Sequence, residues 1–162
     1  MKTTNPIITL KNIKHFEAHS RETNCFSATL YVNGKRFGMV DNAGMGGCDN
    51  VFPFEGGRSA VKELEKAIKE ANPDLDLEII CANLIEEFLI KKDLKRVMKK
   101  ICYVKSDKKG LFQLPAKHKP TPETIATVKQ KASWAKDAIF LHDLSESEAL
   151  EVLKNNFYAD LG

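Results

Sequence analysis

The dipeptide Asn33-Gly34 limits, more than any other feature, what this chain can fold into. The preceding residues 25–32 alternate apolar and polar side chains with the period of two that is typical of a half-buried strand. Residues 35–40 form a second predicted strand on the other side of this dipeptide. Asn-Gly supplies the two residues with positive φ that a type I′ turn requires, and the twist of this turn suits a two-residue hairpin. The sequence therefore predicts a β-hairpin over residues 25–40.

A glycine-rich loop follows the hairpin. Its spacing does not match a dinucleotide-binding fingerprint, which needs G-x-G-x-x-G between a strand and a helix, nor a Walker A loop, which ends in Gly-Lys-Ser or Gly-Lys-Thr. Two hypotheses stay open: a loop that turns sharply for structural reasons, or a nest of backbone N–H groups that contacts an anion or a partner. The residues of the second hypothesis are Asn42, Gly44, Gly46, Gly47, Asp49 and, at the start of the next helix, Arg58.

Beyond the hairpin, the apolar periodicities predict an α+β fold. We expect an antiparallel sheet of about five or six strands, built from two hairpins, with helices packed on one face. The length favours a single domain over residues 1–162, with 121–162 as a candidate helix–strand–helix subunit. Pro53 argues against placing residues 51–54 in the interior of a sheet. The predicted strands are residues 7–16, 25–32, 35–40, 102–105, 111–114 and 138–144, and the predicted helices are residues 59–71, 76–101, 121–135 and 145 onward.

The segment from Asp76 to Ile101 carries two apolar stripes at helical spacing. One stripe begins at Cys81 and the other at Leu94, and at about 100° per residue the second is displaced by about half a turn from the first. A straight helix cannot bury both stripes against one surface. We therefore expect a break next to Asp93, which would cap a second short helix.

Positive charge is concentrated between Lys91 and Lys109, where nine lysines and arginines accompany two aspartates, although the whole chain has a net charge of only +3. Helical spacing places four of these cations opposite the second apolar stripe: Lys95, Arg96, Lys99 and Lys100. Such a surface suits a polyanion, either nucleic acid or an acidic protein, and a merely solvated helix face is the alternative. Only Tyr103 and Phe112 are candidates for stacking on bases. The candidate partner-binding residues are Lys91, Lys92, Lys95, Arg96, Lys99, Lys100, Lys105, Lys108 and Lys109.

The cysteines and histidines form no local signature of a metal centre or of a catalytic nucleophile, although folding could bring Cys48 close to a histidine. The four cysteines lie 21 to 33 residues apart, so the short ligand pairs of zinc sites are absent from the sequence. We expect no metal and no cofactor. With neither a membrane-length apolar run nor a secretory signal, we also expect reduced thiols, a cytoplasmic location and no membrane partner.

These observations favour a non-catalytic binding protein that acts through the basic helix–hairpin surface. The alternative is a small-molecule or nucleotide-binding protein, or an enzyme, whose site is the loop of residues 42–49. A polyanionic partner fits the first interpretation, and a small ligand fits the second.

Four segments of the chain carry a resemblance to other proteins: residues 22–37, 44–49, 109–112 and 143–150. The most specific are the string Glu22-Thr-Asn-Cys-Phe-Ser-Ala-Thr-Leu-Tyr-Val-Asn-Gly-Lys-Arg-Phe37 and the motif Gly44-x-Gly-Gly-Cys-Asp49. In these segments the chain resembles a family of small uncharacterised proteins of bacteria and their phages. The resemblance covers most of the chain and implies no activity. Carriage by phages implies a host–virus interaction, such as inhibition of a bacterial defence protein.

Overall fold

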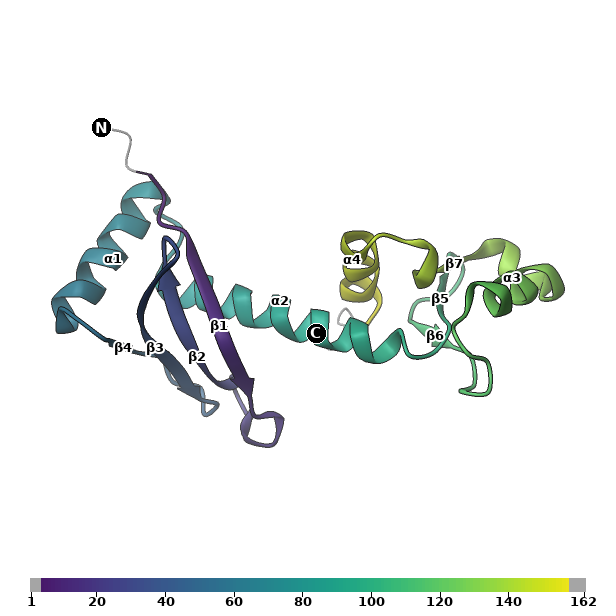
Figure 1. The fold of residues 1–162 in the computed structure, drawn as a ribbon, viewed down its shortest axis with the longest axis horizontal. Helices are drawn as coiled ribbons and strands as arrows, with labels where there is room; N and C mark the ends of the chain where they lie inside the picture. Colours follow the sequence, from purple (N-terminus) through teal and green to yellow (C-terminus); the bar gives the residue numbers. More distant parts are fainter. Residues whose placement is uncertain (1–3, 158–162) are drawn as a thin grey trace. The chain divides into compact units, whose positions relative to one another are not determined.

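The computed structural model describes residues 4–157, which belong to two compact units of mixed helix and strand (Figure 1). The first unit ends at Glu86 and the second begins at Glu87. All strand pairs among the described residues are antiparallel, and the predicted α+β class is confirmed. The strands are shared between two sheets, of four and of three strands, and each sheet contains one of the two expected hairpins.

The sheet of the first unit is a meander in which each strand pairs with the next along the chain. Its strands are β1 (Ile8–His15), β2 (Cys25–Val32), β3 (Lys35–Ala43) and β4 (Asn50–Pro53). Asn33 and Gly34 join β2 to β3 with φ of 50° and 78°, which confirms the predicted tight turn. β4 pairs with β3 at the edge of the sheet, where Pro53, which has no N–H to donate, is tolerated.

The core of the first unit takes side chains from this sheet, from helix α1 (Gly57–Ala71) and from the start of the helix after it. Leu30 and Val40 lie on neighbouring strands, and both are completely buried. Alternate residues of a strand point to the same face, so every second position of these strands can contribute to the core. Leu64 and Ile68 are buried at the i, i+4 spacing of one helix face. Burial of apolar side chains such as these is the main driving force for folding the unit.

The second unit is built on a three-stranded sheet with the order β6-β5-β7. Its elements are β5 (Cys102–Lys105), β6 (Phe112–Gln113), α3 (Pro122–Lys131), β7 (Ala138–Phe140) and α4 (Glu146–Phe157). Successive residues of β5 belong to different apolar clusters. Cys102 and Val104 pack with side chains of α4, whereas Tyr103 packs against a cluster that contains Ile125 of α3 and Phe140 of β7.

Helix α2 (Leu77–Val97) continues through the point where we expected a break. Asp93 lies in its interior, so the predicted break and the capping role of Asp93 are wrong. Both stripes are buried nonetheless, because each lies in a different unit: Cys81 and Ile85 in the first, and Leu94 and Val97 in the cluster with α4. The displacement between the stripes therefore requires no interruption of the backbone hydrogen bonds.

Short 3₁₀ helices replace the ends of two predicted elements. The helix predicted over residues 121–135 ends at Lys131 and is followed by the 3₁₀ helix Ser133–Asp137. The strand predicted over 138–144 ends at Phe140, where the 3₁₀ helix Leu141–Asp143 begins.

Side-chain caps begin the last two helices. Thr121 Oγ1 accepts a hydrogen bond from the Thr124 N–H, and Pro122 occupies the first turn of α3. The Ser145 N–H donates to Glu148 Oε2 at 2.9 Å, and the Glu148 N–H donates back to Ser145 Oγ at 3.3 Å. This reciprocal capping box lowers the pKa of Glu148 through its bonds to Ser145 and fixes the start of α4.

A proline at position 92 tests the continuity of α2. Lys92 is exposed, so its replacement changes the backbone without removing a buried side chain. In a helix interior, proline removes a hydrogen bond and clashes with the preceding turn, which costs about 3 kcal/mol or more. We expect Lys92→Pro to lower the free energy of unfolding in urea by at least this amount, and Lys92→Ala to change it by less than about 0.5 kcal/mol. Equal stability of the two variants would show that the helix is interrupted at this position.

Candidate functional site

The net charge of the chain is divided unevenly between the two units. Residues 87–162 contain fifteen lysines and arginines and ten aspartates and glutamates, a net charge of +5. Residues 1–86 contain ten and twelve, a net charge of −2. The second unit is therefore the part of the chain that a polyanion attracts.

The nine candidate partner-binding residues all lie in this second unit. Six of them are exposed on the second half of α2 and the turn after it, whereas Leu94 and Val97 of the same helix are buried. The other three belong to the β5–β6 hairpin: Lys105 ends β5, and Lys108 and Lys109 lie in the connection to β6. The basic residues thus extend from a helix into an adjoining hairpin.

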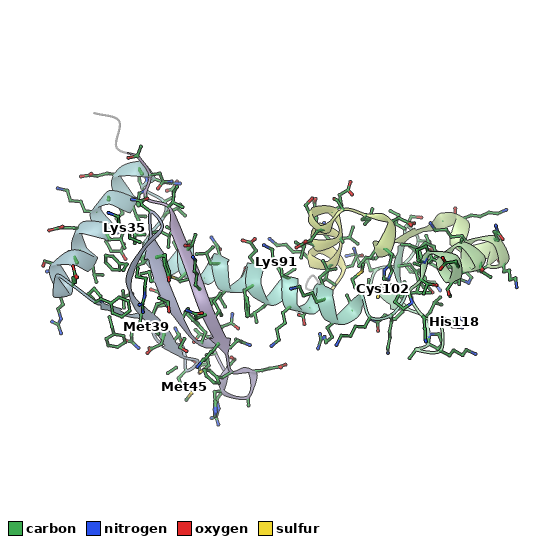
Figure 2. The ribbon with its side chains drawn as sticks, viewed as in Figure 1. Lys35, Met39, Met45, Lys91, Cys102 and His118 are labelled. Atoms are coloured by element: carbon green, nitrogen blue, oxygen red, sulfur yellow. The ribbon has the colours of Figure 1, made fainter. Side chains whose placement is uncertain are left out.

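Two of the nine cations have carboxylate partners. Lys91, labelled in Figure 2, donates to Glu87 at 2.7 Å, and this hydrogen bond raises the pKa of Lys91. Arg96 lies 2.9 Å from Asp93 one turn earlier. In the part of the chain that the structure describes, none of the other seven forms an ion pair. We call these seven the lysine surface; they are Lys92, Lys95, Lys99, Lys100, Lys105, Lys108 and Lys109.

Aromatic rings gather around Tyr103 in the same unit. Tyr103 is paired across the sheet with Phe112 on β6 and with Phe140 on β7, and the ring centroids lie 5.5 and 5.7 Å apart. Trp134, from the 3₁₀ helix after α3, stacks on Tyr103 with a centroid distance of 4.4 Å and an interplanar angle of 24°. We call these four residues the aromatic group. Sequence reasoning missed Trp134, because no local spacing relates it to Tyr103.

Lysine ammonium groups lie over the rings of the aromatic group. The Lys105 Nζ is 5.3 Å from the Trp134 centroid and 6.0 Å from the Phe112 centroid. Lys129 Nζ lies 5.3 Å from the Phe140 centroid and is also paired with Asp143. Cations are attracted to ring faces in this way at about 0.5–1 kcal/mol where the site is exposed. The lysine surface and the aromatic group are therefore joined through Lys105.

The glycine loop of the first unit is organised by the buried side chain of Asn42, which is 6% exposed. Its Oδ1 accepts from Thr23 Oγ1 and from the Gly44 N–H, both at 2.8 Å. Its Nδ2 donates to the Gly47 carbonyl and to Asp49 Oδ1, both at 2.9 Å. One amide thus holds both sides of the loop, with each of its hydrogen-bonding capacities used.

Gly44 and Gly46 have structural requirements of their own. Both have positive φ, of 78° and 83°. The Gly44 carbonyl accepts from the N–H groups of residues 21–23, and a Cβ on Gly44 would lie 2.3 Å from the His19 carbonyl oxygen. The Gly46 N–H points to Thr23 Oγ1 at 3.3 Å. These contacts account for the two glycines without a bound anion.

Arg58 and Asp49, the remaining loop candidates, face a cavity of about 320 Å³ in the first unit. Burial raises the pKa of Asp49, against the opposing effect of its hydrogen bond from Asn42. Among the described residues, the buried Asp49 Oδ2 has no hydrogen-bond partner. The arrangement could accept a hydrogen bond from a small polar ligand. The cavity lining is Asp49, Val51, Arg58, Val61, Lys62, Glu65, Leu77, Glu78 and Cys81.

Within residues 4–157, no three His, Cys, Asp or Glu side chains are grouped closely enough to hold a metal ion. None of the helices described there combines the length and the apolar character that a membrane span needs. Comparison of the chain with protein-family models, with curated proteins and with solved structures finds no match. The resemblance to bacterial and phage proteins therefore stays a prediction from the segments that carry it.

Two glycine substitutions test the structural role of the loop. Gly44→Ala places a Cβ at positive φ and against a backbone carbonyl, so we expect it to lower the free energy of unfolding by more than about 2 kcal/mol. Gly47 lacks positive φ, and a Cβ there would meet no atom within 4 Å. Gly47→Ala should therefore leave stability unchanged or raise it by up to about 1 kcal/mol. Equal effects in urea denaturation would contradict this account.

The cysteines should differ in their reactivity towards a disulfide reagent. Cys48 is exposed, whereas Cys81 and Cys102 are completely buried, and burial raises the pKa of Cys81 to about 12. Because the thiolate is the reacting form, we expect Cys48 to react first and Cys81 to react only after unfolding, even at about pH 10. Cys48→Ser should remove the fast phase of labelling. Rapid labelling of Cys81 in the folded protein would contradict this prediction and show that the core of the first unit opens readily.

Proposed function

We propose that this protein binds nucleic acid in the cytoplasm, without catalysis, through the lysine surface of its second unit. The observation that carries the proposal is the junction, in one unit, of partly exposed aromatic rings with seven lysines that form no ion pair among residues 4–157. Lysines supply the electrostatic attraction to phosphates, and aromatic rings can stack on bases. The four free cysteines are in keeping with a reducing compartment.

A protein partner fits this surface less well than nucleic acid does. Lysine is depleted in protein–protein interfaces, where long flexible side chains would have to be ordered and desolvated. A polyanion instead releases counterions when it meets several lysines, and this release favours binding. The lysine surface therefore suits closely spaced phosphates better than it suits a few acidic side chains.

Helix electrostatics explains some of the lysines without any partner. Lys95, Lys99 and Lys100 lie near the C-terminal end of α2, where cations stabilise the helix dipole. Lys108 and Lys109 lie in the β5–β6 connection and gain nothing from that dipole. The hairpin lysines therefore favour a partner-binding function over a role confined to the helix end.

The resemblance to phage proteins suggests a role for such binding. A small phage protein that covers nucleic acid could protect it from a host defence enzyme or compete with that enzyme for its substrate. A phage-type inhibitor that binds an acidic host protein directly is the alternative, and the experiment below separates the two.

Substitutions that remove lysine charges test the proposed surface. We expect Lys95→Gln, Lys99→Gln and Lys100→Gln, combined in one variant, to weaken binding to a labelled oligonucleotide, measured by fluorescence anisotropy. For a single strand, each lost phosphate contact should reduce the slope of log affinity against log salt by about 0.7. The slope for the triple variant should therefore be smaller by about 2. The substitutions are exposed and should leave stability within about 0.5 kcal/mol per site.

A matched control carries the same loss of charge in the first unit. Lys14→Gln, Lys35→Gln and Lys69→Gln replace three exposed lysines there and should leave the salt dependence nearly unchanged. If both triple variants lose affinity equally, net charge alone drives binding. If the wild type binds no single strand, duplex or RNA at low salt, the nucleic-acid function is wrong and an acidic protein becomes the expected partner.

A further inference from the structure

The aromatic group of the second unit has a buried part and an accessible part. Phe140 is 1% exposed and belongs to the apolar cluster with Ile125. Tyr103, Phe112 and Trp134 keep part of their surface exposed. Phe112 is not among the described side chains that pack against the two apolar clusters of this unit. The Phe112 ring instead stacks on Tyr103 at the edge of the sheet and keeps part of its surface exposed.

Lys105 covers part of this accessible ring surface. It lies on the same side of β5 as Tyr103, two residues away, and its ammonium group approaches both Trp134 and Phe112. A base stacked on a ring is held at least as strongly as a partly exposed lysine such as Lys105 over the same ring. A nucleotide also brings a phosphate with which a displaced Lys105 can pair. The exchange thus replaces the two cation–π contacts of Lys105 with a base–ring stacking contact and an ion pair to a phosphate.

We propose that Phe112 and Trp134, packed against Tyr103, form a base-stacking site for single-stranded nucleic acid, and that Lys105 turns from the two rings to a phosphate when a base binds. This inference rests on the proposed function and adds the class of strand that the second unit recognises. A duplex keeps the faces of its bases stacked inside the helix. It can therefore meet the lysine surface through its phosphates without reaching the rings.

Tryptophan emission provides a direct test, because Trp134 is the only tryptophan in the sequence. The whole protein would be titrated with a short DNA single strand, with an abasic strand of the same number of phosphates, with the matching duplex and with an RNA of the same sequence. We expect the single strands to quench the emission and the abasic strand and duplex to bind without comparable quenching. A stronger effect of RNA or of DNA would identify which strand the site prefers.

A ring-deleting variant separates stacking from charge. Phe112→Leu keeps an apolar side chain on the edge strand and leaves Trp134 as the reporter. We expect it to weaken single-strand binding about tenfold and to leave abasic binding unchanged. Ile139→Ala is the control: Ile139 is 53% exposed on β7, and its side chain points away from the face of Phe140. Circular dichroism melting of both variants would confirm that they fold.

Failure of this inference can be distinguished from failure of the proposed function. If the abasic strand quenches Trp134 as strongly as the normal strand, or if Phe112→Leu binds single strands as tightly as the wild type, the stacking site is wrong. Lysine-dependent binding of all four probes in that case would leave the proposed function intact. If no probe binds in anisotropy, both proposals are wrong.

Discussion

The second unit depends on the alternation of side chains along β5, a strand of only four residues. On one face, the Cys102 thiol donates to the Val97 carbonyl at 2.8 Å, which ties the start of the strand to the end of α2. On the other face, the Tyr103 ring is contacted from both neighbouring strands and by Trp134. One short strand therefore positions both the lysine-bearing helix end and the aromatic group.

The two units satisfy their polar groups in different ways. In the first unit, the Asn42 amide uses all of its hydrogen-bonding capacity within the loop that it organises. The second unit instead leaves seven lysines without ion pairs in the described part of the chain. Surface cations gain little from single ion pairs in water, so unpaired lysines cost the fold almost nothing and remain available to a multivalent anion.

Local patterns allowed much of the fold to be predicted. The Asn33-Gly34 turn and the Ser145–Glu148 capping box follow from residues close together in the sequence, and the structure contains both. Non-local packing explains the failures. The break next to Asp93 follows only if both stripes pack against the same surface, whereas the two stripes of α2 are buried in separate units. Of the candidate site, the lysines were visible from composition, but Trp134 joins it through tertiary packing alone.

The opposite charges of the two units affect how the protein meets a polyanion. A nucleic acid attracts the unit with net charge +5 and repels the unit with net charge −2. Encounters are therefore biased in orientation before any contact forms, and productive association is faster than for a uniformly charged protein of the same total charge. The first unit, which carries the cavity beside Asp49, is correspondingly disfavoured as the part of the chain that meets a polyanion first.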